Sequence, residues 1–284
     1  MSTSLFDADV RESIYETVDT RTLVLDVGEH QPYRAGQWVS IDPHQFLGLA
    51  SVVAYLESQK GRREPPREYS MCSAPGDRYV AITIKEEVFE LGKTQYPPLI
   101  SGFLVHHVRA GDKMTVKGFA GGYVLPDDVE ERTGHVLHLC AGSGIVPDYS
   151  IIRDSLQRNS RLRHTLIYSN KTWDDIIFRD ALIDLAAKHP DRLRVNHTLT
   201  RQSAPVPPGN DVRSGRVGVE MVAAALAAEP ESLVYACGPA VSVWERRAGA
   251  AAGTTPPPRF METMRACLEE LAVPRARIKM ESYG

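Results

Sequence analysis

The sequence contains few cysteines, and no two of them are close together. The four are Cys72, Cys140, Cys237 and Cys267 in a chain of 284 residues. No Cys-x-x-Cys pair is present, which argues against a zinc ribbon and against a sequence-local iron–sulfur loop. We therefore expect no bound metal, and we expect free thiols because nothing in the sequence resembles an export signal.

Long apolar runs and an excess of charge of one sign are also missing. No stretch approaches ~20 uninterrupted apolar residues, so we expect no membrane span. Residues 1–7 lack a basic start followed by an apolar run, which favours a cytoplasmic protein over a secreted one. With 33 Lys and Arg against 36 Asp and Glu, the net charge of −3 gives no reason to expect nucleic acid or an anionic membrane as partner.

The length and the composition are those of an ordinary globular protein. Hydrophobic residues make up 43% of the chain and charged residues 24%, which makes widespread disorder improbable. A chain of 284 residues is too long for one small core and is typical of two domains.

The first half carries the signals of an all-β domain. Short segments alternate apolar with polar residues, and turns containing glycine, such as 33–36 and 109–112, separate them. Many short strands at this spacing indicate an antiparallel β-barrel. Two segments, 44–66 and 86–100, interrupt the pattern and are interpreted as insertions. Strands are expected at 20–27, 37–42, 79–86 and 113–118, and helices at 47–57 and 101–108.

The pattern changes after residue 128, where short apolar runs begin to alternate with helical segments. Such alternation predicts an α/β domain with a doubly wound parallel sheet of five strands. We therefore place the domains at 1–130 and 131–284. An Ala- and Pro-rich stretch at 246–258 looks like a third insertion. Strands are expected at 135–140, 166–169, 193–199, 232–237 and 276–283, and helices at 149–159, 174–188, 217–228 and 259–271.

A cation, an aromatic ring and a hydroxyl lie within four positions at Arg67-Glu68-Tyr69-Ser70. In an extended segment Arg67 and Tyr69 share one face, and Ser70 lies on the other. A guanidinium can hold a phosphate in bidentate fashion, and a phenol ring can cover a flat heterocycle. Taken alone, however, these residues are more often simply the start of a strand.

The second domain opens with a glycine-containing loop, Gly142-Ser143-Gly144, after its first strand. Two glycines let backbone N–H groups approach an anion at a helix start, and Pro147 suits the first turn of that helix. Proline stands where the common dinucleotide fingerprint has its third glycine. A tight strand–helix turn is an equally good interpretation of this loop alone.

Two further groups are expected at the carboxyl edge of the same sheet, where ligands of open α/β sheets bind. Cys237-Gly238-Pro239 follows a later strand, so it should lie near the glycine loop. Ser169 and Lys171 follow another strand and could reach a ribose or a phosphate. Each signal is weak by itself.

The order of the motifs is more specific and resembles the ferredoxin–NADP reductase-like family. The resemblance runs from about residue 20 to the C-terminus, outside the insertions, and implies a flavin-binding barrel followed by a pyridine-nucleotide domain. The motifs, in order, are Arg67-x-Tyr69-Ser70, Gly111-Asp112, Gly142-x-Gly144-x-x-Pro147, Cys237-Gly238-Pro239 and Glu281-x-Tyr283.

On the flavin side, the resemblance implies that Arg67 holds the FAD pyrophosphate, that Tyr69 flanks the isoalloxazine and that Ser70 hydrogen-bonds near its N5. The segment 97–100 departs from the small residue or glycine that the family usually has before Ser101. By the same resemblance, the remaining flavin contacts are Ile82, Ile84 and Lys85 on a strand and Ser101 and Gly102 at a helix start.

On the nucleotide side, the resemblance places Cys237 and Gly238 beside the nicotinamide. Asp148 departs from the apolar residue that commonly follows the proline. Tyr283 would cover the flavin and leave before nicotinamide stacks, unless it is only a frayed tail before the last residue, Gly284. The cofactor-binding positions implied are Gly142, Ser143, Gly144, Pro147, Lys171, Gly238, Pro239 and Tyr283, and the catalytic ones Ser70, Cys237, Glu281 and Tyr283.

The leading functional hypothesis is a monomeric FAD-dependent oxidoreductase. It would take hydride from NADPH or NADH and pass electrons singly to a separate ferredoxin, flavodoxin or oxygenase component. Two alternatives remain: a diaphorase that reduces a small acceptor such as a quinone, and a flavin-binding redox-sensing subunit. Lys171, Arg179 or Arg201 could pair with a 2′-phosphate and would favour NADPH. Two basic pairs, Arg62-Arg63 and Arg246-Arg247, could meet an acidic electron carrier.

Overall fold

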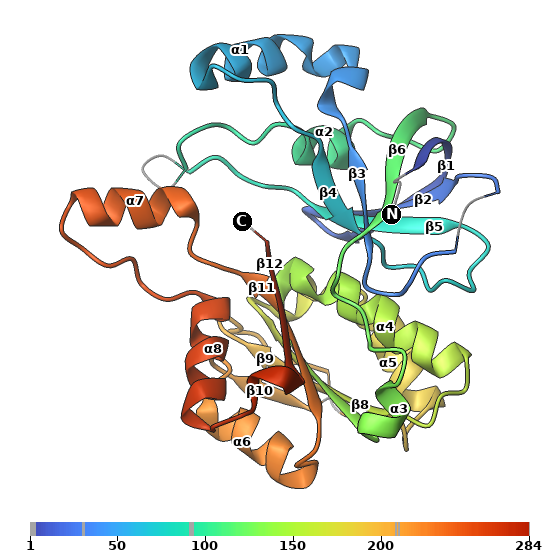
Figure 1. Cartoon of the computed structure of the whole chain (residues 1–284), viewed down its shortest axis with the longest axis vertical. Coiled ribbons are helices and arrows are strands. Elements are labelled where there is room, and N and C mark those ends of the chain that lie inside the picture. The colour runs from blue at the N-terminus through green and yellow to red at the C-terminus, as the bar shows by residue number, and fades with distance from the viewer. Residues whose placement is uncertain (1–3, 30–31, 91–93, 208, 210, 284) are drawn as a thin grey trace. The chain divides into compact units, whose positions relative to one another are not determined.

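The computed structural model describes residues 4–29, 32–90, 94–207, 209 and 211–283 (Figure 1). The chain divides into two compact units, Met1–Val124 and Leu125–Gly284. The boundary predicted after residue 130 falls inside the short helix α3 (Val129–Arg132), which belongs to the second unit. Gly284 and part of the predicted insertion 86–100 lie outside the described residues.

The first unit is built on an antiparallel sheet of six strands, in the order β4-β3-β6-β1-β2-β5. The outer strands β4 and β5 meet through a bridge between Met71 and Ile82. The sheet therefore curves back on itself, as expected of the predicted barrel. Its strands are β1 (Ser4–Thr17), β2 (Thr20–Asp26), β3 (Trp38–Ile41), β4 (Arg67–Ser70), β5 (Val80–Lys85) and β6 (Lys113–Ala120).

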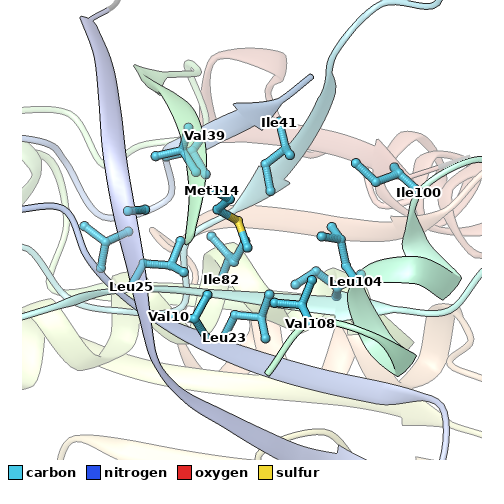
Figure 2. Packing of buried hydrophobic residues seen from close by; sticks show 14 of the residues in the cluster. Val10, Leu23, Leu25, Val39, Ile41, Ile82, Ile100, Leu104, Val108 and Met114 are labelled. Atoms are coloured by element: carbon cyan, nitrogen blue, oxygen red, sulfur yellow. The ribbon is translucent and has the colours of Figure 1, made fainter. Parts of the chain in front are cut away.

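Alternation along the strands fills the barrel with aliphatic side chains. Leu23, Leu25 and Ile82 are fully buried, and Leu104 of α2 (Ser101–His106) covers one end of the cluster. Figure 2 shows these side chains converging from different strands. Burying one such side chain contributes roughly 1.5–3 kcal/mol, so this cluster is the main source of stability in the unit.

The first insertion contains the helix that was predicted, with its bounds shifted to α1 (Ala50–Lys60) after the 3₁₀ turns η1 (Pro43–Gln45) and η2 (Leu47–Leu49). Gly61 ends α1 in the left-handed region at φ +63, and its N–H bonds to the carbonyl of Glu57. Val53 and Leu56 reach the barrel core. The insertion is therefore an integral part of the barrel unit.

The second unit contains a parallel sheet of six strands, in the order β10-β9-β8-β7-β11-β12. Five were predicted; the sixth, β10 (Val212–Ser214), is paired with β9 along only three residues, too few to show an alternation. The other strands are β7 (His135–Ala141), β8 (Arg163–Asn170), β9 (Leu193–Leu199), β11 (Leu233–Pro239) and β12 (Ile278–Tyr283).

The predicted helices of this unit are all present, and the structure adds α7 (Val243–Ala251) inside and just before the stretch that looked like an insertion. Ser242 and Glu245 form a capping box at its start, a pattern that the sequence does contain. The other elements are η3 (Gly142–Gly144), α4 (Ile145–Gln157), η4 (Trp173–Asp175), α5 (Arg179–Lys188), α6 (Val219–Ala228), α8 (Phe260–Glu270) and η5 (Arg275–Arg277).

The two faces of the parallel sheet differ in chemistry. Helices α6 and α8 cover one face, where Leu137, Leu139 and Val234 pack in an apolar cluster (Figure 1). The other face, towards α4, receives the alternate residues of the same strands, among them His138 and Cys237. The pleat of the sheet thus directs His138 and Cys237 to the face opposite the apolar cluster.

Buried histidines make the second unit sensitive to acid. His135 lies between Ser232 and Thr165, with hydrogen bonds of 2.7 Å and 2.9 Å, and burial lowers its pKa to about 4. Burial also lowers the pKa of His197 to about 4. As pH falls, the histidines of the unfolded chain bind protons before those of the folded chain do. The stability that the neutral histidines provide is therefore lost as pH falls from the ordinary histidine pKa towards the lower pKa of the folded state.

We predict that replacing His135 with Gln makes the second unit less sensitive to acid. Between about pH 7.5 and about pH 5, the free energy of unfolding of the native chain should fall by roughly 2 kcal/mol more than that of H135Q. The reason is that the ordinary histidine pKa lies about 1.5 units above pH 5. Hydrogen exchange of the β7 amides reports the free energy of opening in this unit. H107Q, at an exposed histidine of the first unit, should behave as the native chain. Equal acid sensitivity of H135Q and the native chain would contradict this assignment.

Candidate functional site

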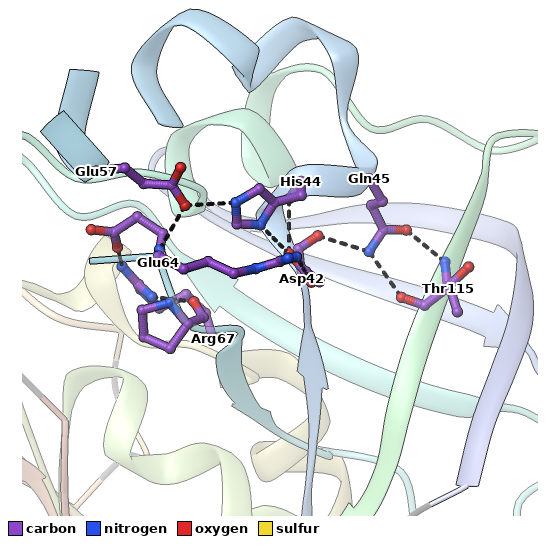
Figure 3. Close-up of polar contacts among 9 residues, drawn as sticks. Asp42, His44, Gln45, Glu57, Glu64, Arg67 and Thr115 are labelled. Carbon is purple, nitrogen blue, oxygen red and sulfur yellow. Dashed lines mark hydrogen bonds and ion pairs between the residues drawn. The ribbon is translucent and has the colours of Figure 1, made fainter. Parts of the chain in front are cut away.

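Arg67 is the first residue of β4, and a network of ion pairs holds its side chain. Its guanidinium donates to the Glu64 carboxylate and to the carbonyl of Pro65 (Figure 3). Glu64 is buried and also pairs with Lys60 at 2.6 Å. A guanidinium has five N–H donors, so Arg67 keeps donors for a ligand while its position is fixed.

The first insertion extends this network. The backbone N–H of Glu64 donates to Glu57 of α1, at 2.9 Å, and His44 bridges Glu57 and Asp42 (Figure 3). Hydrogen bonds to Asp42 and then Glu57 raise the pKa of His44. The loop that orders Arg67 is therefore itself ordered by the inserted helix.

Tyr69 and Ser70 lie where the predicted strand puts them. The Tyr69 ring is half-buried against the barrel core, and burial, with Glu87 nearby, raises the pKa of its phenol, which stays neutral. Ser70 is buried and is the register partner of Trp38 in the neighbouring strand β3. One half-exposed cation, one ring and one hydroxyl thus occupy a single short strand.

The remaining flavin-side candidates are less open to a ligand. The side chains of Ile82 and Ile84 are in the barrel core, so only the main chain of β5 is left for a cofactor contact. Lys85 forms an ion pair with Asp19 at 2.6 Å.

Residues Glu86 and Glu87 already contact the start of α2. The Ser101 hydroxyl is buried and accepts the backbone N–H of Glu87 at 3.1 Å. A Cβ on Gly102 would come within 3.3 Å of the Glu86 carboxylate. A negative charge thus lies where the resemblance implies an anion, so the roles of Ser101 and Gly102 stay predictions.

In the second unit, the glycine loop Gly142–Gly144 packs closely against the end of β11. A Cβ on Gly144 would lie 2.2 Å from the carbonyl oxygen of Cys237 and 2.7 Å from the nitrogen of Gly238. The Tyr168 hydroxyl donates to the carbonyl of Gly142 at 2.9 Å, where the backbone has a positive φ of +54. The loop and the Cys237-Gly238-Pro239 segment therefore lie side by side.

The other candidate residues of this region differ in exposure. Ser143 is half-buried, Pro147 is buried in the first turn of α4, and Pro239 is exposed at the end of β11.

Three of the four candidate catalytic residues meet at this edge. Cys237 and Glu281 are register partners in β11 and β12, and the Tyr283 hydroxyl is hydrogen-bonded to the Cys237 thiol. Burial, followed by the charges of Asp148 and Glu281, raises the pKa of Cys237, which is a neutral thiol. Tyr283 is paired in β12 and is not a frayed tail. The fourth candidate, Ser70, belongs to the other unit.

The carboxyl ends of β8 and β9 carry cations and orphaned polar groups. Arg179 is paired with Asp174 and Asp180. Lys171 and Arg201 are exposed, joined by a backbone hydrogen bond of 2.8 Å, and form no ion pair with any described residue. Ser169 precedes this pair at the end of β8.

Two residues beside Ser169 and Lys171 were missed. The Asn170 amide nitrogen and the Thr198 hydroxyl are buried and have no partner among the described residues. The signal was available in the sequence, since both are polar residues at the ends of expected strands. Hydroxyl and phosphate oxygens of a nucleotide suit such a set of donors.

The two basic pairs are partly neutralised. Arg63 pairs with Asp42 at 3.1 Å, and Arg246 lies 3.9 Å from Glu262. Arg62 and Arg247 are exposed.

Within the described residues no helix is both long and apolar enough to cross a membrane.

Comparison with known proteins agrees with this geometry. Residues 139–242 match the family model of the oxidoreductase NAD-binding domain. The chain is 29% identical over 282 residues to the ferredoxin reductase component of 3-ketosteroid-9-alpha-monooxygenase from Mycobacterium tuberculosis, covering 98% of this chain and 65% of that protein. The chain thus spans just under two thirds of the length of this curated relative.

Two solved structures have the same fold over nearly the whole chain. The FAD/NAD-binding domain of a Vibrio cholerae nitric oxide dioxygenase has a TM-score of 0.69 at 22% identity and covers 98% of both chains. A ferredoxin-NADP+ reductase from Plasmodium falciparum has a TM-score of 0.70 at 15% identity, covering 98% of this chain and 96% of its own. The two-unit architecture is therefore a known one.

We predict that Gly144→Ala destabilises the second unit. The added Cβ meets main-chain atoms of β11 at 2.2 Å, which cannot rotate away, so the loop must shift, at a cost of about 2 kcal/mol or more in the free energy of unfolding. Gly134→Ala is the matched control, because its Cβ meets nothing within 4 Å. If thermal unfolding of the two variants coincides, the close contact between loop and strand is not as described.

Proposed function

We propose that this chain, which belongs to the ferredoxin–NADP reductase-like family of flavoproteins, transfers electrons from NADH or NADPH through FAD to a separate redox protein. The observation that carries the proposal is the contact of the Gly142–Gly144 loop with Cys237 and Gly238, beside Glu281 and Tyr283. It brings a glycine loop, a helix start and two strand ends together at the carboxyl ends of a parallel sheet, the place where such folds bind ligands.

The flavin binds to the barrel unit, and the residues of β4 fit that group. Arg67 supplies donors for a pyrophosphate, Tyr69 a neutral half-buried ring for a flat heterocycle, and Ser70 a hydroxyl beside it. Bound FAD supplies the chemistry of accepting a hydride and releasing electrons one at a time. The protein's own part is to hold the ring system and to keep the adjoining side chains uncharged.

The nicotinamide nucleotide binds to the second unit. Backbone N–H groups of Gly142, Ser143 and Gly144, at the positive start of α4, receive its pyrophosphate. Cys237 lies at the end of the neighbouring strand and presents a neutral thiol, while Tyr283 is the ring to be displaced when nicotinamide stacks. The orphaned donors of Asn170 and Thr198, with Lys171 and Arg201, suit the ribose and phosphate at the adenosine end.

The electron acceptor is a ferredoxin, a flavodoxin or an oxygenase component. This part of the proposal is supported by the mycobacterial relative, which is named as the ferredoxin reductase component of a monooxygenase. An acidic carrier would find Arg62 and Arg247 exposed on the surface. We propose that the chain acts as a monomer.

We predict that Arg67→Ala releases FAD while Arg63→Ala does not. Both changes remove an arginine from the same unit, but Arg63 is paired on the surface with Asp42. Losing one charge-assisted phosphate contact should weaken FAD binding by about ten- to a hundred-fold. Flavin retained through gel filtration, measured by absorbance, is the readout.

Anaerobic addition of NADPH or NADH tests the proposal as a whole. The yellow native protein should bleach and then pass electrons to an added ferredoxin. A colourless protein with no flavin after denaturation would contradict the flavoprotein assignment. Bleaching followed by transfer only to quinones would instead support a diaphorase, and a bound flavin that neither nucleotide reduces would support a sensor.

We also predict that Lys171→Ala raises the KM for NADPH by about ten-fold and leaves the KM for NADH within about two-fold, because only NADPH offers a 2′-phosphate to the exposed ammonium group. Lys188→Ala removes an exposed lysine from the end of α5 and should change neither constant. Equal effects of K171A on both nucleotides would remove Lys171 from the phosphate site.

A further inference from the structure

A chain of buried hydrogen bonds joins α4 to the polar face of the sheet. Asp148 accepts a bond from Nδ1 of His138 at 2.6 Å, Nε2 of His138 lies 3.0 Å from Nδ1 of His164, and Nε2 of His164 lies 2.8 Å from the Ser155 hydroxyl. All four side chains are at most 1% exposed. The proposed function uses none of them.

All the hydrogen bonds in this series can form when both imidazoles are neutral. Burial, and then the neighbouring His138, lowers the pKa of His164 well below its ordinary value, so this imidazole is neutral. The Ser155 hydroxyl then donates to His164, His164 donates to His138, and His138 donates to Asp148. In this arrangement each ring nitrogen has one partner, and the Asp148 carboxylate accepts the bond from His138.

This buried carboxylate is compensated locally. The thiol of Cys140 is hydrogen-bonded to it, in addition to the N–H of His138. Asp148 also lies in the first turn of α4, where the helix dipole favours an anion. A buried carboxylate is tolerated only with such partners.

The position of the charge connects it with the chemistry. Asp148 directly follows Pro147, and it is close enough to Cys237 to raise the pKa of that thiol. Cys237 is the register partner of Cys140, and its main chain touches Gly144. The carboxylate therefore lies close to Cys237, the residue beside which the nicotinamide ring is proposed to bind.

An ionised carboxylate at this place would distinguish the two redox forms of the nucleotide. When hydride transfer breaks a C–H bond of the dihydronicotinamide, the hydrogen leaves with both bonding electrons to the flavin, and the ring becomes a cation. The reduced ring is neutral and the oxidised ring carries one positive charge, while the rest of the nucleotide is unchanged.

We propose that Asp148, held by His138 and His164, is an electrostatic positioning residue that favours the cationic nicotinamide formed as the hydride leaves. This inference rests on the proposed function and adds to it a residue that touches neither nucleotide nor flavin.

The test compares two ligands on the oxidised holoprotein by calorimetry. One is NAD(P)+, with a cationic ring; the other is its tetrahydro derivative, with a neutral ring that cannot donate a hydride. D148N should weaken the cationic ligand by about ten-fold, the size expected for one unit charge acting across a short distance in a protein interior. Binding of the tetrahydro derivative should stay within about two-fold.

Asp154→Asn is the matched control. It makes the same change on the same helix, at a carboxylate paired with Arg158 at 2.7 Å, and should alter neither affinity. Equal weakening of both ligands by D148N would show a purely structural role and overturn the proposal, as would no change in either. If D148N does not fold, H138L/D148L replaces both partners by apolar residues and must show the same selective loss.

The same experiment separates this inference from the proposed function. If the native holoprotein binds neither ligand, or contains no flavin, the proposed function itself fails. If the native protein binds both ligands and NADPH or NADH reduces its flavin, but D148N does not discriminate between the ligands, only the role of Asp148 is overturned.

Discussion

The second unit depends on one close approach of two backbones, that of Gly144 to Cys237. Only a residue without a Cβ allows the carbonyl of Cys237 so near, and this contact sets the distance between the helix start that can bind an anion and the strand end that carries the thiol. The paired β12 then brings Glu281 and Tyr283 to the same edge. Loop, thiol, carboxylate and ring are thus arranged by main-chain geometry, with side chains adding only the chemistry.

In the barrel unit, a charged network has the corresponding role. Arg67 is placed by Glu64, and Glu64 by Glu57 of the inserted helix. The segment that looked like an interruption in the sequence therefore supports Arg67, the cation proposed to hold the pyrophosphate. A buried carboxylate with two cationic partners is expensive to disturb, so the guanidinium is held in one orientation before any ligand arrives.

The sequence was sufficient to predict the two kinds of domain, most of their elements and the meeting of the glycine loop with Cys237. These features follow from local periodicity and from the rule that parallel strands present their ends at one edge. Strand β10 was not predicted because three residues are too few to show a periodicity. Helix α7 was not predicted because its sequence is rich in Ala and Gly, although it begins with a capping box. The links between His138, Asp148 and His164 depend on the register of two strands and the rotation of a helix, which no spacing in the sequence reveals. The ion pair of Lys85 with Asp19 likewise depends on strand pairing across the barrel, which the sequence does not reveal.

The division of the parallel sheet into two faces has a consequence for engineering. Residues such as Leu139 and Val234 face the apolar cluster, whereas their chain neighbours His138 and Tyr235 face α4. A library that varies every second position of β7, β8 and β11 would therefore act on one face of the sheet at a time. Because His138 and Tyr235 are buried as well as Leu139 and Val234, each library would change the packing against the helices on its own side of the sheet.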